Sequence, residues 1–153
     1  MFLTFIIGLV SVAAVALATN AFAQKGQFGT AAEAMTMEER AIAELKANEA
    51  AALAKFNKAD GGFRDRDLYV YCFETATGKF TAHVNSALIG TDVRALKEKD
   101  GAPLGQKVFD AAKAGTITTI SYNFPKPGGT DPVAKEAYVT AVGNQGCGVG
   151  YYK

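Results

Sequence analysis

The chain has 153 residues, of which 49% are hydrophobic and 20% are charged, a size and composition typical of one globular domain. Its 16 basic and 15 acidic residues leave a net charge of +1, and the basic residues form neither a run nor a pattern interleaved with aromatic residues. This composition argues against nucleic acids and anionic membrane surfaces as partners.

Residues 1–23 are uncharged and contain an apolar run that starts at Phe2. Ala-Phe-Ala at 21–23 then matches the small-x-small pattern of a signal-peptidase site. We expect a signal peptide that is cleaved after Ala23, and a soluble periplasmic domain over 24–153. A retained membrane anchor is the alternative, because no Lys or Arg precedes the run, but the run is short for a span of about 20 residues.

The next segment predicts helix. Thr30 with Glu33 and Thr36 with Glu39 both match the capping box, in which a hydroxyl and a carboxylate satisfy each other's backbone amides. From 37 to 57 the apolar residues fall on one helical face, and glycines follow shortly afterwards. We expect one long amphipathic helix that lies across the sheet formed by the residues after it.

Residues 67–84 carry two runs that are rich in aromatic and β-branched residues, separated by Thr-Ala-Thr-Gly. Gly78 can supply the positive φ that a short connection needs, so the two runs predict an antiparallel hairpin. By the period of two along a strand, Tyr69 and Tyr71 project to the same face. The segment after the hairpin predicts a short helix over 93–99 and a second helix over 104–114.

Three more strands complete the predicted sheet: 116–124, 136–142 and 146–152. Ile120, Tyr122 and Phe124 lie on one face of the first of these strands. The segment 125–132 contains three prolines and two glycines and is therefore expected to be a loop. The sequence predicts an α+β fold: a five-stranded antiparallel sheet with a long N-terminal helix and short helices inserted between strands two and three.

The chain contains two cysteines, Cys72 and Cys147. An even number of cysteines in an exported chain favours a disulfide. A bridge across about 75 residues would stabilise the fold by at most about 4.5 kcal/mol. Two buried free thiols are the alternative, because sequence alone does not place two residues within bonding distance.

Eight segments, in this order, resemble the single Cache domains, which are extracytoplasmic small-molecule sensor modules. They are Ala47–Asn48 with Ala54–Asn57, Asp67–Tyr71, Ala82–His83, Leu88–Gly90, Leu96–Lys97 with Asp100–Gly101, Tyr122–Pro127, Lys135–Val139 and Gly146–Tyr151. The pattern is similar to that of the exported, stand-alone members of type 2, but Phe124 stands where tryptophan is common and Val84 where a small residue is frequent. The resemblance implies a PAS-like sheet in which Cys72 and Cys147 lie on neighbouring strands. It also implies a small pocket beneath the inserted segment 85–115.

We expect six residues to bind a ligand: Tyr71, His83, Tyr122, Phe124, Lys135 and Tyr138. Lysine supplies a positive charge, tyrosine hydroxyls orient an acceptor and aromatic rings exclude water, a combination that suits a small carboxylate. A solvated position is the alternative for Lys135. A structural, hydrogen-bonded position is the alternative for His83, although the resemblance favours the pocket.

We expect neither a metal nor a cofactor, because zinc needs three or four ligands and the chain has one histidine. Cys72 and His83 could form a nucleophile and its base, but export and a disulfide argue against this arrangement. The alternating glycines at 146–150 are not a dinucleotide fingerprint, because no helix follows them. The sequence therefore predicts a protein that is not an enzyme.

Together these features predict a soluble periplasmic sensory protein that binds a short organic carboxylate. Its occupancy would be passed to a membrane receptor, kinase or transporter. The alternative is a disulfide-stabilised structural or interaction module of the cell envelope that binds no small ligand. A filled interior, or a Lys135 side chain in solvent, would favour this alternative.

Overall fold

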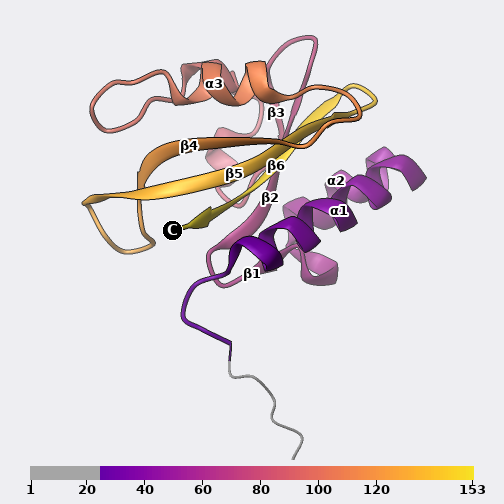
Figure 1. Cartoon of the computed structure of the whole chain (residues 1–153). Helices are drawn as coiled ribbons and strands as arrows, with labels where there is room; N and C mark the ends of the chain where they lie inside the picture. The colour runs from indigo at the N-terminus through magenta and orange to yellow at the C-terminus, as the bar shows by residue number, and fades with distance from the viewer. Residues whose placement is uncertain (1–24) are drawn as a thin grey trace, which may run out of the picture.

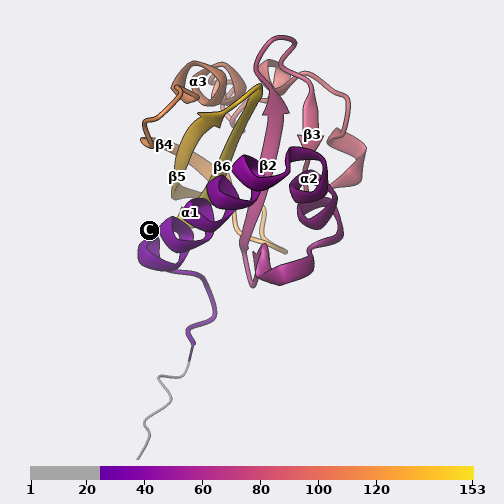
Figure 2. The ribbon, with the colours of Figure 1, turned by 90° about the vertical axis from the view of Figure 1, so that its right-hand side faces the viewer.

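The computed structural model describes residues 25–153, and the predicted signal peptide, residues 1–23, lies outside them. An antiparallel sheet forms the middle layer of the molecule (Figure 1). Helices α1 (Ala31–Ala47) and α2 (Glu49–Lys58) cover one face, and the segment 83–115 with helix α3 (Leu104–Ala111) covers the other (Figure 2). Within residues 25–153 no helix combines the length and hydrophobicity that crossing a bilayer requires.

The sheet is antiparallel, as predicted, but has six strands instead of five. Its strands are β1 (Arg64–Asp65), β2 (Leu68–Glu74), β3 (Phe80–Ala82), β4 (Thr118–Pro125), β5 (Pro132–Val142) and β6 (Gln145–Tyr152). The order is β1-β2-β6-β5-β4, and β3 also pairs with β2. The additional strand β1 is only two residues long, too short to show a periodic pattern in the sequence.

The predicted loop 125–132 is shorter in the structure. Strands β4 and β5 extend until Pro125 and Pro132 are directly paired. Both prolines stand at strand ends, where the missing N–H costs no interior ladder bond. The loop is therefore limited to residues 126–131.

The prediction of one continuous helix over 37–57 is wrong. The capping box of Thr30 and Glu33 is confirmed and begins α1 at Ala31, whereas the hydroxyl of Thr36 donates to a backbone carbonyl inside the helix. Asn48 ends α1 with extended backbone angles and also caps α2, because its side chain accepts a hydrogen bond from the N–H of Ala51 (3.0 Å). The break changes the course of the helical layer as it crosses the sheet (Figure 2).

Residues 83–115, which cover the face of the sheet opposite α1 and α2, form a roof. It contains the 3₁₀ helices η2 (Ser86–Leu88) and η3 (Val93–Ala95) followed by α3. The predicted helix 93–99 is thus only one turn long, and α3 ends at Ala111 rather than 114. A Cβ on Gly105 would lie 1.7 Å from the carbonyl oxygen of Val93, so only glycine lets α3 pack this closely against η3.

Two hydrophobic cores lie on opposite faces of the sheet. The first, between the sheet and α1 and α2, includes Phe56, Leu68 and Val149. The second, between the sheet and the roof, includes Phe73, Val93 and Val139. Cys72 and Cys147 face each other across β2 and β6 on the helix side and form a disulfide.

Helix α1 brings one carboxyl group into the first core. Glu38 is fully buried, and neither of its side-chain oxygens has a hydrogen-bond partner among the described residues. Burial raises the pKa of this carboxyl to about 8, because ionisation inside an apolar core is unfavourable. Glu38 is therefore mainly protonated at neutral pH.

We predict that Glu38→Met stabilises the protein at pH 7 by about 1–3 kcal/mol, because it removes a buried polar group that lacks a partner. The raised pKa in the folded state means that wild-type stability declines as pH rises from about 4.5 to about 8, and the variant should lose this component of the decline. Urea denaturation at pH 5, 7 and 8 measures both effects. Glu39→Met, at an exposed neighbouring position, is the control and should change stability by less than about 0.5 kcal/mol. A Glu38→Met variant less stable than wild type at pH 8 would contradict this account.

Candidate functional site

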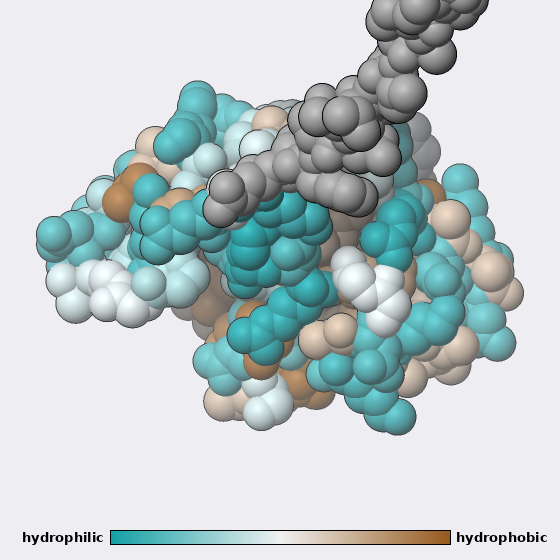
Figure 3. Space-filling model, turned by 90° about the horizontal axis from the view of Figure 1, so that it is seen from below, coloured by the Kyte–Doolittle hydropathy of each residue, from teal (hydrophilic) through white to brown (hydrophobic). Residues whose placement is uncertain are grey.

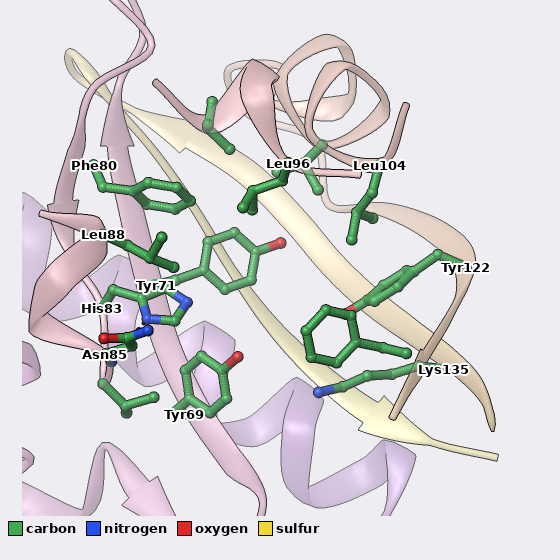
Figure 4. A pocket seen from close by; sticks show the side chains of 14 residues that line it. Tyr69, Tyr71, Phe80, His83, Asn85, Leu88, Leu96, Leu104, Tyr122 and Lys135 are labelled. Atoms are coloured by element: carbon green, nitrogen blue, oxygen red, sulfur yellow. Dashed lines mark hydrogen bonds between the residues drawn. The ribbon is translucent and has the colours of Figure 1, made fainter. Parts of the chain in front are cut away.

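A cavity of about 300 Å³ lies between the sheet and the roof (Figure 4). Its lining consists of Tyr69, Tyr71, Phe80, His83, Val84, Asn85, Leu88, Val93, Leu96, Leu104, Val108, Tyr122, Phe124 and Lys135. None of these 14 described residues is Asp or Glu. The cavity therefore combines hydrogen-bond donors with apolar and aromatic walls and holds one formally cationic side chain.

The glycines of β6 lie beneath side chains that line this cavity. Gly148 and Gly150 lie on the roof-side face of the strand, and side chains from neighbouring strands lie across them. A Cβ on Gly148 would lie 2.5 Å from the hydroxyl of Tyr71, and one on Gly150 would lie 2.8 Å from the hydroxyl of Tyr122. The alternating glycines thus provide the space that these phenols occupy.

The side chain of Lys135 lies inside the site. It is only 4% exposed, and its ammonium nitrogen is 4.5 Å from the ring centroid of Tyr152, 5.6 Å from that of Tyr69 and 5.8 Å from that of Phe124. No ion pair to this nitrogen is formed within the described part of the chain. Burial lowers the pKa of Lys135 to about 8, against a smaller opposing effect of Asp67.

His83 is held by three aromatic rings and one hydrogen bond. Its ring centroid lies 5.2 Å from that of Tyr69, 5.4 Å from that of Phe80 and 6.5 Å from that of Tyr71. Its Nδ1 accepts the backbone N–H of Asn85 (2.9 Å). Burial, with a smaller contribution from Lys135, lowers the pKa of His83 to about 4. The imidazole is neutral at pH 7, and because Nδ1 accepts, its proton is on Nε2.

Three phenols complete the polar part of the lining. Burial raises the pKa of Tyr69, Tyr71 and Tyr122, so all three hydroxyls remain protonated in the physiological range. The hydroxyl of Tyr71 is buried and has no hydrogen-bond partner among the described residues. Together with the ammonium and the imidazole N–H, these hydroxyls can donate hydrogen bonds to a ligand that carries acceptor atoms.

The roof supplies the apolar end of the cavity. Its aliphatic side chains are Leu88, Val93, Leu96, Leu104 and Val108. Two polar contacts fasten the roof to the edge strand β4: Lys107 Nζ donates to the carbonyl of Ser121 (2.9 Å), and the N–H of Asn123 donates to the Glu98 carboxylate (2.7 Å). These contacts hold the aliphatic wall opposite the sheet.

The structure brings five of the six predicted ligand-binding residues to this cavity: Tyr71, His83, Tyr122, Phe124 and Lys135. Tyr138 does not line it. Three positions separate Tyr138 from Lys135 on β5, so the two side chains lie on opposite faces of the sheet. Tyr138 packs against Tyr151 (5.4 Å between ring centroids) on the helix side.

Several lining residues were not predicted from the sequence. The strand period had placed Tyr69 on the face of Tyr71, but it could not show that this face meets the cavity. Asn85 and the aliphatic residues of the roof belong to the segment that the resemblance placed over the pocket, but no pattern in the sequence showed which of its side chains reach the cavity. The alternating glycines of β6 were visible in the sequence and could have indicated that side chains cross this strand.

The face of the molecule that is seen from below differs from the cavity lining in its hydrophobicity. Viewed from below, the surface is mainly hydrophilic, with small groups of hydrophobic residues scattered over it (Figure 3). The lining of the cavity, by contrast, is mainly aromatic and aliphatic, which suits a site that excludes water from a ligand.

Comparisons with known proteins agree with this architecture. The family model described as "Single Cache domain 2" matches residues 19–151. A methyl-accepting chemotaxis protein from Vibrio parahaemolyticus RIMD 2210633 is a structural neighbour with 19% identity and a TM-score of 0.63, covering 79% of this chain and 86% of its own. No curated protein matches the sequence significantly.

Two further solved structures are similar. A Cache chemosensory domain whose structure explains carboxylic acid recognition has 22% identity and a TM-score of 0.61, covering 79% of this chain and 91% of its own. A periplasmic sensor domain of a chemotaxis protein has 24% identity and a TM-score of 0.57, covering 77% of this chain and 86% of its own. At these identities the likeness shows a shared fold.

We predict that Gly148→Ala destabilises the protein by about 1–3 kcal/mol, because the added Cβ would meet the Tyr71 hydroxyl at 2.5 Å and the Tyr138 carbonyl oxygen at 2.7 Å. Urea denaturation measures the loss. Gly26→Ala is the control, since a Cβ there meets only one backbone oxygen at 3.6 Å. Equal stability of Gly148→Ala and wild type would show that β6 does not need glycine at this position.

Proposed function

Because the chain belongs to the single Cache domain 2 family, we propose that it is a soluble periplasmic sensory protein that binds a short organic carboxylate. We propose further that residues 1–23 are a signal peptide cleaved after Ala23 and that 24–153 form the sensory domain. The uncharged apolar run and the Ala-Phe-Ala pattern at 21–23 support export.

One observation carries the ligand proposal: the ammonium of Lys135 is buried in a cavity whose described lining contains no carboxylate. Asp67 acts on this ammonium from outside the lining but forms no ion pair with it, and a bound carboxylate would provide a counter-ion in direct contact. The neutral imidazole of His83 and the phenol of Tyr122 can donate to the same ligand. Carboxylic acid recognition by a structural neighbour supports the same ligand class.

The same observation disfavours the alternative of a structural module without a ligand. That alternative calls for a filled interior or a solvated Lys135, whereas the structure has a cavity of about 300 Å³ and a lysine that is 4% exposed. We also propose that the protein is not an enzyme. The disulfide of Cys72 with Cys147 supports this, because neither sulfur is then a free thiolate nucleophile.

Signalling requires a difference between the empty and the occupied protein. We propose that a bound carboxylate draws the roof, residues 83–115, toward the sheet and so shifts the population between two domain states. The partner that reads this shift would be a membrane receptor, kinase or transporter. Only a ligand that binds one state better than the other can produce the signal.

We predict that Lys135→Met weakens carboxylate binding by about 10- to 100-fold, which corresponds to the loss of a charge-assisted hydrogen bond. It should also make the empty protein more stable, because it removes a buried, unpaired charge. Thermal-shift screening against short acids, amines and amino acids identifies the ligands, and calorimetric titration measures their affinity. Lys58→Met, on the exposed side of α2, is the control. Absence of a shift with every acid would reject the carboxylate proposal.

We predict that carboxylate affinity falls as pH rises above about 8, because the lowered pKa of Lys135 leaves the amine uncharged there. Binding at pH 9 should be about tenfold weaker than at pH 7. A Lys135→Arg variant that still binds should show no such decline, because arginine remains charged at both pH values. Constant wild-type affinity between pH 7 and 9 would mean that the charge of Lys135 is not used.

A further inference from the structure

The hydroxyl of Tyr71 marks a second polar position in the cavity. It is buried, it has no hydrogen-bond partner among residues 25–153, and its residue lines the cavity. The hydroxyl lies over Gly148 of β6, and Figure 4 shows it extending away from the backbone of β2 toward the side of Tyr122. A buried donor without a partner is unfavourable, and a ligand that brings an acceptor to it removes this cost.

Tyr71 lies between two chemically different ends of the cavity. Lys135, Tyr69 and His83 form one end, and Leu96 and Leu104 of the roof form the other, on the far side of the Tyr71 ring (Figure 4). A carboxylate at Lys135 therefore leaves the next part of the ligand beside the Tyr71 hydroxyl and its last part beside aliphatic side chains.

The charges of the lining limit the ligand further. Lys135 is the one formally cationic residue among the 14 described residues of the lining, and no acidic residue accompanies it. A second carboxylate on the ligand would thus be buried without a counter-ion, and an ammonium group would meet no carboxylate in the lining. At about 30 Å³ for each water-sized group, a volume of about 300 Å³ has room for about ten non-hydrogen atoms.

We infer that the ligand is an aliphatic monocarboxylate that carries an uncharged hydroxyl or keto oxygen. The carboxylate lies at Lys135, the second oxygen accepts a hydrogen bond from the Tyr71 hydroxyl, and the remaining carbon chain lies beneath Leu96 and Leu104. This inference rests on the proposed function, and it adds a specificity-determining role for Tyr71.

The test is calorimetric titration of the wild-type protein with a matched series of five-carbon acids. The series contains pentanoate, the 2-, 3- and 4-hydroxypentanoates, 4-oxopentanoate, the dicarboxylate glutarate and the amino acid norvaline. At least one oxygenated monocarboxylate should bind about three- to tenfold more tightly than pentanoate, the gain expected from one added hydrogen bond. Glutarate and norvaline should bind more weakly than pentanoate.

The variant Tyr71→Phe tests the assignment of the second oxygen. It should remove the preference for the oxygenated acid over pentanoate, and the empty variant should be at least as stable as wild type because an unpaired hydroxyl is lost. Tyr138→Phe removes a hydroxyl from the opposite face of the sheet and should retain the preference.

The outcomes separate this inference from the proposed function. Failure of every acid to bind would reject the proposed function itself. Binding of pentanoate as tightly as all the oxygenated acids would overturn the inference and leave the carboxylate proposal intact. A preference that survives in Tyr71→Phe would overturn the role of Tyr71. The wild-type comparison needs no variant and decides the ligand class even where Tyr71→Phe does not fold.

Discussion

A buried ammonium group, which forms no ion pair within residues 25–153, is the constraint on which the site depends. Lys135 is held among aromatic rings, and their faces stabilise the cation only partly. The rest of the described lining is consistent with this charge, since it contains no carboxylate and since His83 remains neutral beside the lysine. A bound anion would replace this unfavourable burial by favourable charge pairing, so the proposed binding and its specificity would have a common origin.

The two faces of the sheet differ in role: the helix side carries the disulfide and the larger core, and the roof side carries the cavity. On the helix side, β2 and β6 are joined by Cys72 and Cys147 within the larger core. On the roof side, the same strand β6 presents glycines, and the side chains of Tyr71 and Lys135 lie over it. Because successive residues of a strand point to opposite faces, one short sequence can meet both requirements. The disulfide thus joins β2, which carries Tyr69 and Tyr71, to β6, whose glycines lie beneath the side chains of the lining.

Patterns among residues that are close in sequence account for the parts of the fold that could be predicted. Strand alternation and the hairpin turn gave the α+β class and placed Tyr122 and Phe124 on one face. The helix break at Asn48 was missed, because asparagine inside a helical pattern looks the same whether or not it acts as a cap. Tyr138 was misplaced although its odd spacing from Lys135 already indicated the opposite face. The resemblance placed the inserted segment 85–115 over a pocket, but the roof residues that line it could not be predicted, because their position depends on contacts distant in sequence, such as those of Glu98.

The central claim is that the cavity selects its ligand by charge at Lys135. Calorimetric titration of the wild-type protein with pentanoate and with pentanamide, which has nearly the same shape but no charge, tests this claim most directly. The account predicts that pentanoate binds and that pentanamide binds at least about tenfold more weakly, because only the carboxylate pairs with the buried ammonium. Equal affinities would contradict the account and would mean that the cavity recognises shape alone.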